Sequence, residues 1–247
     1  MSNTAASFIA KSTIKAADLE HRRKINFNIG KYNAVVPIGK QQFNSVMSAR
    51  EQAKNIKWKA IENLDKHLEV FEQKITARGA KVIWAEDAQQ ALDEIGKICD
   101  AKNCKTLVKS KSMVTEEIHL NHFLEQRGIE SVETDLGEYI QQLDGEPPYH
   151  IVTPAMHKSK EDVARLFAAK LGVPGGLSPE GLTQVARQLL REKYVQAEVG
   201  VTGANFILAD IGGIAITENE GNGRLSCSMP KTHIVIAGIE KVIPSMQ

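Results

Sequence analysis

The chain has 247 residues, of which 42% are hydrophobic and 25% charged, proportions that are ordinary for a globular protein. This length fits one large domain, or one domain with an appendage. No run approaches the roughly 20 apolar residues that are needed to span a membrane. The N-terminus also lacks the basic segment and long apolar core of a secretory signal. We therefore expect a cytoplasmic protein without a membrane span.

The charge is unevenly distributed along the chain. Residues 1–80 carry 14 Lys and Arg against 7 Asp and Glu, whereas the remainder carries 17 against 23. A basic segment of this kind suits nucleic acid or an acidic partner. Its few aromatic residues do not alternate with the charges as a base-stacking surface requires. We therefore expect no nucleic acid partner, and interpret the segment as a solvated helical face that docks on an acidic neighbour.

The first part of the chain is predicted to be helical. Residues 12–32 form one predicted helix, and Val35–Gly39 breaks the pattern. Ser45–Arg78 is predicted as one long helix that ends before Gly79, because apolar residues recur along it at steps of three and four. These residues are Ile61, Leu64, Leu68, Phe71 and Ile75. The sequence thus predicts an N-terminal helical extension over residues 1–79.

From residue 80 the pattern changes to alternating strands and helices, which predicts an α/β domain over residues 80–247 with a mainly parallel sheet flanked by helices. Right-handed crossovers would bring the carboxyl ends of all its strands to one edge. The glycine-rich final segment suggests short antiparallel additions to the sheet. The predicted strands are Lys81–Ala85, Thr106–Val108, Glu130–Thr134 and His150–Thr153. The predicted helices are Asp87–Lys97, Thr115–Arg127, Leu136–Leu143, Ser159–Leu171 and a last one that Ser178 caps and that runs from Pro179 to about Tyr194.

A first candidate site is the lysine–serine segment, made up of Lys109, Ser110, Lys111 and Ser112. It follows a predicted strand and precedes a predicted helix, a position where free backbone N–H groups and the helix dipole favour an anion. Its two ammonium and two hydroxyl groups would hold a phosphate or a carboxylate. It lacks the glycines of a nucleotide-binding P-loop. The alternative is that one hydroxyl caps the helix while the lysines stay in solvent.

A second candidate site is the glycine-rich run from Glu198 to His233, whose glycines allow tight turns and close approach to a ligand. Arg224 would hold a carboxylate through a bidentate contact, and Glu220 would act as a nucleophile or base. Thr202, Asn205 and Asn222 supply further polar groups. The alternative is a set of hairpin turns, with an ion pair at the tip. We expect this run and the lysine–serine segment to converge in one electropositive cleft.

The chain contains three cysteines, Cys99, Cys104 and Cys227. Their odd number and wide spacing argue against a disulfide framework. They are too few for the usual four-thiolate zinc or iron–sulfur site. We therefore expect reduced, mostly buried thiols, with neither a metal nor a cofactor in this chain.

Five blocks of sequence, in this order, resemble the LUD domain family over roughly residues 20–245. The blocks are Lys109–Asn121, Glu133–Leu143, His150–Lys158, Gly200–Gly212 and Asn219–Ser226. The resemblance implies a fold like that of the NagB/RpiA/CoA-transferase group. It also implies a subunit of an L-lactate-oxidising iron–sulfur oxidoreductase complex, with a small carboxylate as substrate, pyruvate as product and the other subunits of the lactate-utilisation complex as partners.

The resemblance further implies a ferredoxin-like segment with C-x-x-C-x-x-C spacing after the LUD domain. The sequence stops at Gln247 before any such cysteines, so we expect the 4Fe–4S clusters in a C-terminal part that is missing from this chain. Two alternatives remain open. One is a CoA-transferase or sugar-phosphate isomerase-like enzyme in which Glu220 accepts the acyl group. The other is a non-catalytic assembly module that uses residues 1–80 as a docking arm.

Overall fold

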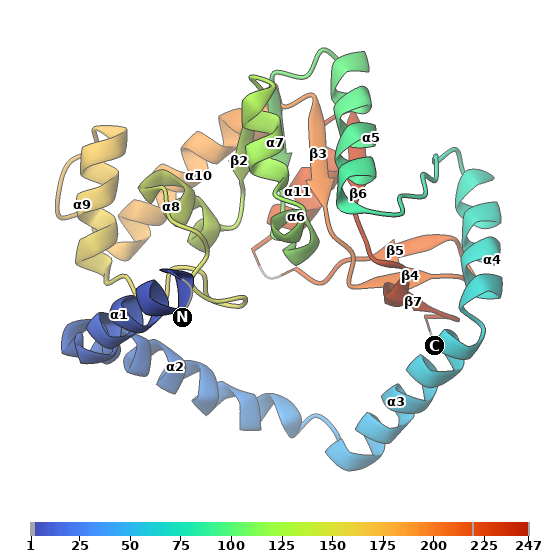
Figure 1. Cartoon of the computed structure of the whole chain (residues 1–247), viewed down its shortest axis with the longest axis horizontal. Coiled ribbons are helices and arrows are strands. Elements are labelled where there is room, and N and C mark those ends of the chain that lie inside the picture. The colour runs from blue at the N-terminus through green and yellow to red at the C-terminus, as the bar shows by residue number, and fades with distance from the viewer. Residues whose placement is uncertain (1–2, 219, 247) are drawn as a thin grey trace. The chain divides into compact units, whose positions relative to one another are not determined.

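The structure, a computed structural model, describes residues 3–218 and 220–246. The chain divides into two compact units (Figure 1). The first unit comprises the residues up to 46 together with 140–184, and the second comprises 47–139 together with the residues from 185 onward. The predicted boundary between residues 79 and 80 remains a prediction. Among the residues that the structure describes, no helix is both long and apolar enough to cross a bilayer.

The first unit is helical. Helices α1 (Asn3–Ala17) and α2 (Leu19–Lys40) meet at Asp18, whose carboxylate caps α2 by accepting a hydrogen bond from the His21 N–H at 3.0 Å. The break predicted at Val35–Gly39 is wrong, because α2 contains Pro37 in its last turn and ends only at Lys40. Helix α9 (Lys160–Leu171) begins with a capping box. Helices α8 (Leu136–Asp144) and α10 (Pro179–Gln196) cross from one unit to the other.

The strand predicted at His150–Thr153 is wrong, and its own side chains explain why. The Nδ1 atom of His150 accepts hydrogen bonds from the backbone N–H groups of Val152 at 3.1 Å and Thr153 at 3.3 Å. These bonds bend the backbone and use donors that a strand would give to a neighbour. The apolar side chains of Ile151 and Val152 consequently stay exposed.

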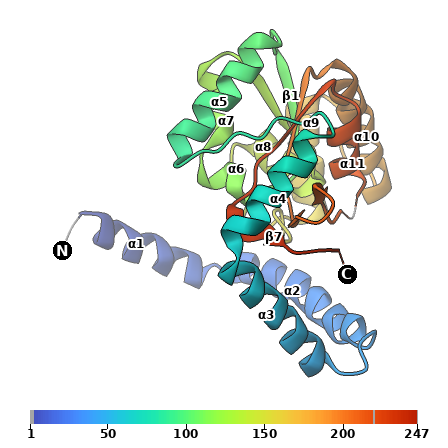
Figure 2. The same ribbon diagram turned by 90° about the vertical axis from the view of Figure 1, so that its right-hand side faces the viewer.

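A four-stranded parallel sheet forms the centre of the second unit. Its strand order is β2 (Glu130–Glu133), β1 (Thr106–Lys109), β3 (Val199–Thr202) and β6 (Thr232–Val235). Helices α5 (Ala88–Ala101) and α7 (Leu120–Gln126) cover one face (Figures 1 and 2). Helix α11 (Asn222–Ser228) and the last part of α10 cover the other. The predicted α/β class with a parallel sheet flanked by helices is confirmed.

Alternation along the strands divides the core between the two faces. Leu107, Val199 and Val201 pack with buried residues of α5 and α7. Val108 packs with Leu190 and Tyr194 of α10. The sheet is thus buried on both sides, as parallel sheets require.

A smaller sheet contains β5 (Gly213–Ala215), β4 (Phe206–Leu208) and β7 (Val242–Ile243), the last preceded by the 3₁₀-helix η1 (Ile239–Lys241). The expected antiparallel addition is right for β4 and β5, but β7 pairs parallel to β4 and β6 parallel to β3. Helix α4 (Leu64–Thr76) packs on this sheet through Phe71. The strand predicted at Lys81–Ala85 is wrong: Val82 packs against the same apolar cluster from a segment without strand pairing.

Besides the helix predicted over residues 12–32, which Asp18 divides between α1 and α2, two predicted helices are each divided in two. The one predicted over Ser45–Arg78 breaks at Asn63, whose φ of −127° is not helical, so that α3 (Val46–Glu62) ends before α4 begins. The one predicted over Thr115–Arg127 consists of α6 (Met113–Glu117) and α7, separated by His119 at φ 56°. Hydrophobic periodicity continues through both breaks, which is why it did not reveal them.

Candidate functional site

The carboxyl ends of the four parallel strands lie at one edge of the large sheet. Three backbone hydrogen bonds join the segments that leave this edge: Ser110 N–H to the Val201 carbonyl at 2.9 Å, Thr134 N–H to the Lys109 carbonyl at 3.1 Å, and Ile236 N–H to the Thr202 carbonyl at 2.9 Å. Ligands of open α/β sheets bind in the crevice outside such carboxyl ends. We therefore take this carboxyl edge as the candidate site.

The lysine–serine segment leaves β1 at this edge. Ser110 and Ser112 are buried, and Lys111 is half-buried. A Cβ atom added to Gly203 would lie 2.7 Å from the Ser112 Oγ, so the segment packs directly against the turn after β3. Within residues 3–218 and 220–246, Lys111 forms neither a hydrogen bond nor an ion pair within bonding distance. Its ammonium group is therefore available to an anion.

Glu220 reaches the same edge from the glycine-rich run. Its carboxylate accepts a hydrogen bond from the Leu136 N–H at 3.3 Å. Its side chain keeps an exposed surface, but neighbouring atoms desolvate the carboxylate and raise its pKa, as does the charge of Asp135. The Leu136 N–H and the Lys111 charge act in the opposite direction. The structure thus brings Glu220 into the electrostatic field of the lysine–serine segment.

The predicted hairpin tip at Gly221–Gly223 is instead the start of helix α11. Gly221 adopts a φ of 80°, which turns the chain into the helix. Arg224 pairs with Glu218, which accepts its backbone N–H at 2.8 Å and lies 3.6 Å from its Nε. The Asn222 Oδ1 accepts the Gly223 N–H at 3.0 Å. The hairpin alternative is therefore wrong at Gly221–Gly223, although β4 and β5 of the same run do form an antiparallel hairpin and an ion pair does involve Arg224.

Asn205 and Thr202 occupy different surroundings from each other. The Asn205 Oδ1 accepts the Thr217 N–H at 2.7 Å, which ties Asn205 to the turn that follows β5. Thr202 is fully buried at the end of β3, with its hydroxyl 2.8 Å from the Nε2 of His233. Of these two, only Thr202 lies at the end of a strand of the large sheet.

Helix α11 approaches the sheet backbone to backbone. A Cβ atom added to Gly200 would lie 2.0 Å from the Ser226 carbonyl oxygen, so no other residue fits there without displacing the helix. The Ser226 hydroxyl lies 3.4 Å from the Thr134 hydroxyl, which in turn donates to the Lys109 carbonyl at 2.8 Å. These contacts fix α11 against the ends of β1, β2 and β3.

Four charged residues form a buried charge cluster beneath the edge: Lys109, Glu116, Glu133 and Glu138. The Lys109 Nζ lies 2.5 Å from the Glu133 Oε1 and 2.9 Å from the Glu116 Oε1, and Lys109 has no exposed surface. Burial lowers the pKa of Lys109, but the two carboxylates outweigh that effect and the pKa is raised overall. The charge of Lys109 is therefore compensated inside the protein.

Glu138 joins this cluster from the first turn of α8. Only 3% of it is exposed, and its Oε2 atom has no hydrogen-bond partner among the described residues. Burial and the nearby Glu133 charge raise the pKa of Glu138 to about 9, against the opposing charge of Lys109. Asn121 donates a second hydrogen bond to the Glu133 Oε1, at 2.7 Å, and its own side-chain oxygen accepts from Ser131 at 2.8 Å.

Sequence reasoning did not identify Glu133 and Glu138 as members of a charged cluster. Glu138 follows Asp135 by three residues, and the structure does show a cap there, with the Glu138 N–H donating to the Asp135 Oδ1 at 3.1 Å. This local pattern explains the backbone of Glu138 but not its side chain. The one signal in the sequence was the position of Glu133 near the end of the strand predicted over Glu130–Thr134. A carboxylate that is buried in a sheet needs a cationic partner.

His233 and Cys227 form a further polar pair that sequence reasoning left out of the site. The Cys227 Sγ lies 3.5 Å from the same Nε2 atom of His233 that contacts Thr202. Desolvation raises the pKa of the Cys227 thiol and lowers that of His233, so both groups are held in their neutral forms. Cys99, Cys104 and Cys227 are all free thiols. No group of three or more His, Cys, Asp or Glu among the described residues is arranged to hold a metal ion.

The first unit contains a pocket of about 490 Å³ lined by both acidic and basic side chains. Its cations are neutralised by its own carboxylates: Lys24 contacts Asp162 at 2.6 Å, Arg165 contacts the same carboxylate, and Lys158 contacts Asp144. This balance of charge does not favour an anion over a cation. The carboxyl edge of the large sheet, with its available ammonium group, is the better candidate.

These features define an α/β domain with polar side chains at the carboxyl edge of its sheet, and comparison with known proteins identifies its family. The model of the LUD domain matches residues 68–247. The chain therefore belongs to the LUD domain family. No solved structure gives a significant match to it.

Several curated bacterial proteins are similar to most of the chain. Lactate utilization protein B of Bacillus velezensis is 46% identical over 197 residues, which are 79% of this chain and 41% of that protein. The Bacillus subtilis protein of the same name gives the same identity and coverage. The uncharacterized electron transport protein YkgF of Escherichia coli K12 is 43% identical over 196 residues, again 79% of this chain and 41% of the relative. The chain thus spans about two fifths of the length of these relatives.

Proposed function

We propose that this LUD domain takes part in lactate utilisation, within a cytoplasmic L-lactate-oxidising iron–sulfur complex that forms pyruvate. The proposal is supported by its 46% identity to lactate utilization protein B over 197 residues. The 4Fe–4S clusters of such a complex would lie outside this chain. The role of the LUD domain would be to bind the small carboxylate at the carboxyl edge.

The observation that carries the binding role is the available ammonium group of Lys111. It lies between the buried Ser110 and Ser112 and in the electrostatic field of Glu220. A carboxylate placed there would accept a charge-assisted hydrogen bond from Lys111. Glu220, whose pKa is raised, would then face the hydroxyl or keto group of the bound acid. Thr202, Asn205, Asn222 and Arg224 remain proposed binding residues, and Lys109 would contribute through the segment it anchors.

Calorimetric titration of the chain with L-lactate and with pyruvate tests this role. We expect Lys111→Ala to weaken binding roughly 10- to 150-fold, because one hydrogen bond to a charged group contributes roughly 1.5–3 kcal/mol. Lys105→Ala is the matched control, since Lys105 is an exposed lysine immediately before the other end of β1. Binding that responds equally to both substitutions, or no binding of either acid by the unsubstituted chain, would refute the proposed site.

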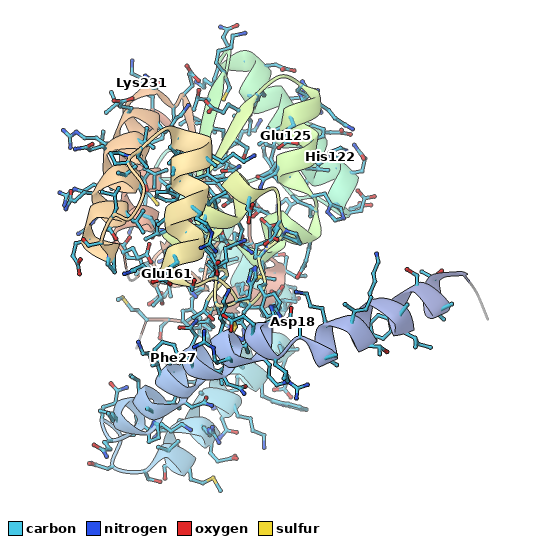
Figure 3. The ribbon with its side chains drawn as sticks, turned by 90° about the vertical axis from the view of Figure 1, so that its left-hand side faces the viewer. Asp18, Phe27, His122, Glu125, Glu161 and Lys231 are labelled. Atoms are coloured by element: carbon cyan, nitrogen blue, oxygen red, sulfur yellow. The ribbon has the colours of Figure 1, made fainter. Side chains whose placement is uncertain are left out.

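A second candidate function is assembly, and the N-terminal helices favour it. Helix α2 has 22 residues and buries none of them. Its exposed apolar residues include Leu19, Phe27, Val35 and Ile38, and Phe27 is labelled in Figure 3. Isolated helices are marginal in water and gain most of their stability from packing an apolar face. These helices would therefore dock on other subunits of the lactate-utilisation complex.

Paired substitution of Val35 and Ile38 by Ser tests assembly. Because 62% of Val35 and 64% of Ile38 are exposed, we expect the free energy of unfolding to change by less than about 0.5 kcal/mol per site. Co-purification of the other subunits should fall by an order of magnitude or more. Val195→Ser, at an equally exposed residue of α10, is the control. Undiminished co-purification would refute the docking role.

A further inference from the structure

Two of the three cysteines lie at the two ends of one turn, where helix α5 ends in a Schellman motif. The Cys104 N–H donates to the Cys99 carbonyl at 2.9 Å. The Asn103 N–H donates to the Asp100 carbonyl at 3.0 Å, and Asn103 has the left-handed conformation of this motif, with a φ of 50°. These are the two bonds that define the motif, and the side chains at its two ends commonly contact each other. In this turn both of those side chains are thiols.

The backbone of the turn holds the two cysteines within the range that a disulfide spans. The 2.9 Å bond, with the covalent bonds on either side of it, keeps the Cα atoms of Cys99 and Cys104 within about 6.8 Å. Disulfides join residues whose Cα atoms lie roughly 4.4–6.8 Å apart. Both side chains belong to the same buried apolar cluster, so both point toward the core, and both are free thiols. A disulfide between them is therefore within reach of the folded turn.

The third cysteine lies in a different place. Cys227 belongs to helix α11, which covers the face of the large sheet opposite to α5 (Figures 1 and 2). Its Sγ lies 3.5 Å from the Nε2 atom of His233. The sheet thus separates Cys227 from the other two thiols. Within one folded chain, Cys99 and Cys104 can pair only with each other.

The two thiols of the turn differ in acidity and lie close to the surface. The Cys104 thiol lowers the pKa of Cys99, whereas the Cys99 thiol and burial raise the pKa of Cys104. Because the thiolate is the nucleophile in thiol oxidation, Cys99 is the cysteine that reacts first. Cys99 has no exposed surface and Cys104 only 6%, but residues 101–103 between them are exposed. A small reagent therefore reaches the pair when this end of the helix opens locally.

We propose that Cys99 and Cys104 form an oxidation site that reduces a hydroperoxide and closes into a reversible disulfide. The Cys99 sulfur attacks the O–O bond, so that an S–O bond forms and the departing oxygen takes the thiol proton as water or an alcohol. The Cys104 sulfur then attacks the resulting sulfenic acid, forming the S–S bond and releasing water. The two thiols lose two electrons and the hydroperoxide gains them. The cross-link would tie the end of α5 to the segment that enters β1.

This site is distinct from the candidate carboxylate site. Cys104 precedes the first residue of β1 by two positions, and its Sγ donates to the Thr106 carbonyl at 3.5 Å. The pair thus lies at the amino end of β1, whereas the candidate site lies at the carboxyl ends of the strands. The proposal goes beyond the binding of a carboxylate and does not depend on it.

Peptide mapping of the whole chain after treatment with hydrogen peroxide tests the cross-link. Remaining thiols are alkylated, and the chain is digested with trypsin without a reductant. Because trypsin cleaves after lysine, the cross-link would join the peptides Ile98–Lys102 and Asn103–Lys105, with the loss of two hydrogen atoms. We expect this linked pair together with alkylated Cys227, and dithiothreitol should separate it. Alkylated or irreversibly oxidised Cys99 and Cys104, or a link to Cys227, would overturn the proposal.

A second experiment separates the effect of the fold from the short distance along the sequence. The whole chain and a peptide of residues 97–105 are each equilibrated with reduced and oxidised glutathione. Because the turn holds the cysteines together before they react, we expect the equilibrium constant for disulfide formation to be about tenfold higher in the chain. Equal constants would overturn the proposal. Cys227→Ala, the matched control, should give the constant of the unsubstituted chain, and Cys104→Ala should give no linked peptides. Failure of lactate to bind would leave both experiments unaffected.

Discussion

Two lysines separated by one residue occupy opposite environments at the same sheet edge. Lys109 points into the buried charge cluster, where two carboxylates contact it. Lys111 is half-buried, and no carboxylate of the described residues lies within 4.0 Å of its ammonium. Alternation alone would place both lysines on one face, so their difference arises because β1 ends at Lys109 and because Glu133 of β2 lies beside that residue. It separates a cation that holds the protein together from one that is available for a ligand.

The contrast shows that the number of lysines in a segment does not measure its capacity to bind anions. A buried cation that is already paired offers little attraction to a ligand, because its field is cancelled locally. An unpaired cation at a half-buried position is desolvated in part and still accessible. The lysine–serine segment therefore has one ammonium for binding, where its sequence suggests two.

Removing the buried cation should have the largest effect. We expect Lys109→Met to lower the free energy of unfolding by about 3–5 kcal/mol, because Glu133 would keep a buried charge without its cation. Chemical denaturation measures this change. Lys111→Met, the matched control, should change the free energy of unfolding by less than about 0.5 kcal/mol. Similar losses for the two substitutions would show that the lysines are not distinct in their roles.

The pH dependence of stability gives a smaller effect from the same cluster. Folded Glu138 keeps its proton up to a pKa of about 9, whereas the unfolded side chain loses it near 4.5. Folding thus takes up a proton between these values, and the stability that this supplies decreases as the pH rises. The slope should be about 1 kcal/mol per pH unit.

Denaturation of the unsubstituted chain and of Glu138→Gln at several pH values between 4.5 and about 9 measures this slope. The amide that Glu138→Gln introduces cannot titrate, so the variant should lose that part of the slope and should be the more stable protein at the alkaline end. Parallel curves for the two proteins would contradict the shifted pKa of Glu138.

Sequence patterns predicted two strands of the parallel sheet well, because buried strands leave strong local signals, whereas β3 and β6 lie in the segment that was expected to add antiparallel strands. Thr106–Val108 and Glu130–Thr134 were placed within one residue of β1 and β2. The two false strands contain similar apolar runs, but no neighbouring strand pairs with them. Val82 packs on an apolar cluster instead, and His150 captures the backbone donors of its own turn. Pairing partners are a tertiary property that a local apolar run does not encode.

The candidate site was predictable only in part. The position of the lysine–serine segment after a strand identified the carboxyl edge, since the topology brings all strand ends together. Its packing on Gly203 and the proximity of Glu220 depend on tertiary contacts. The proximity of Glu138 to Glu133 also depends on tertiary contacts, because the two residues lie on different elements. Helix α11 replaced the expected hairpin because Gly221, with φ 80°, turns the chain into a helix rather than into a return strand.

Gly200 and Gly203 have a consequence for the way in which any ligand is received. At Gly200 of β3, the backbone of Ser226 in α11 packs directly on the strand. At Gly203, in the turn after β3, the side chain of Ser112 packs directly on the backbone. Such contacts leave few alternative packings, since interiors this close are not continuously deformable. The two flanks of the candidate site are therefore preorganised, so that recognition of a ligand there would cost little conformational entropy.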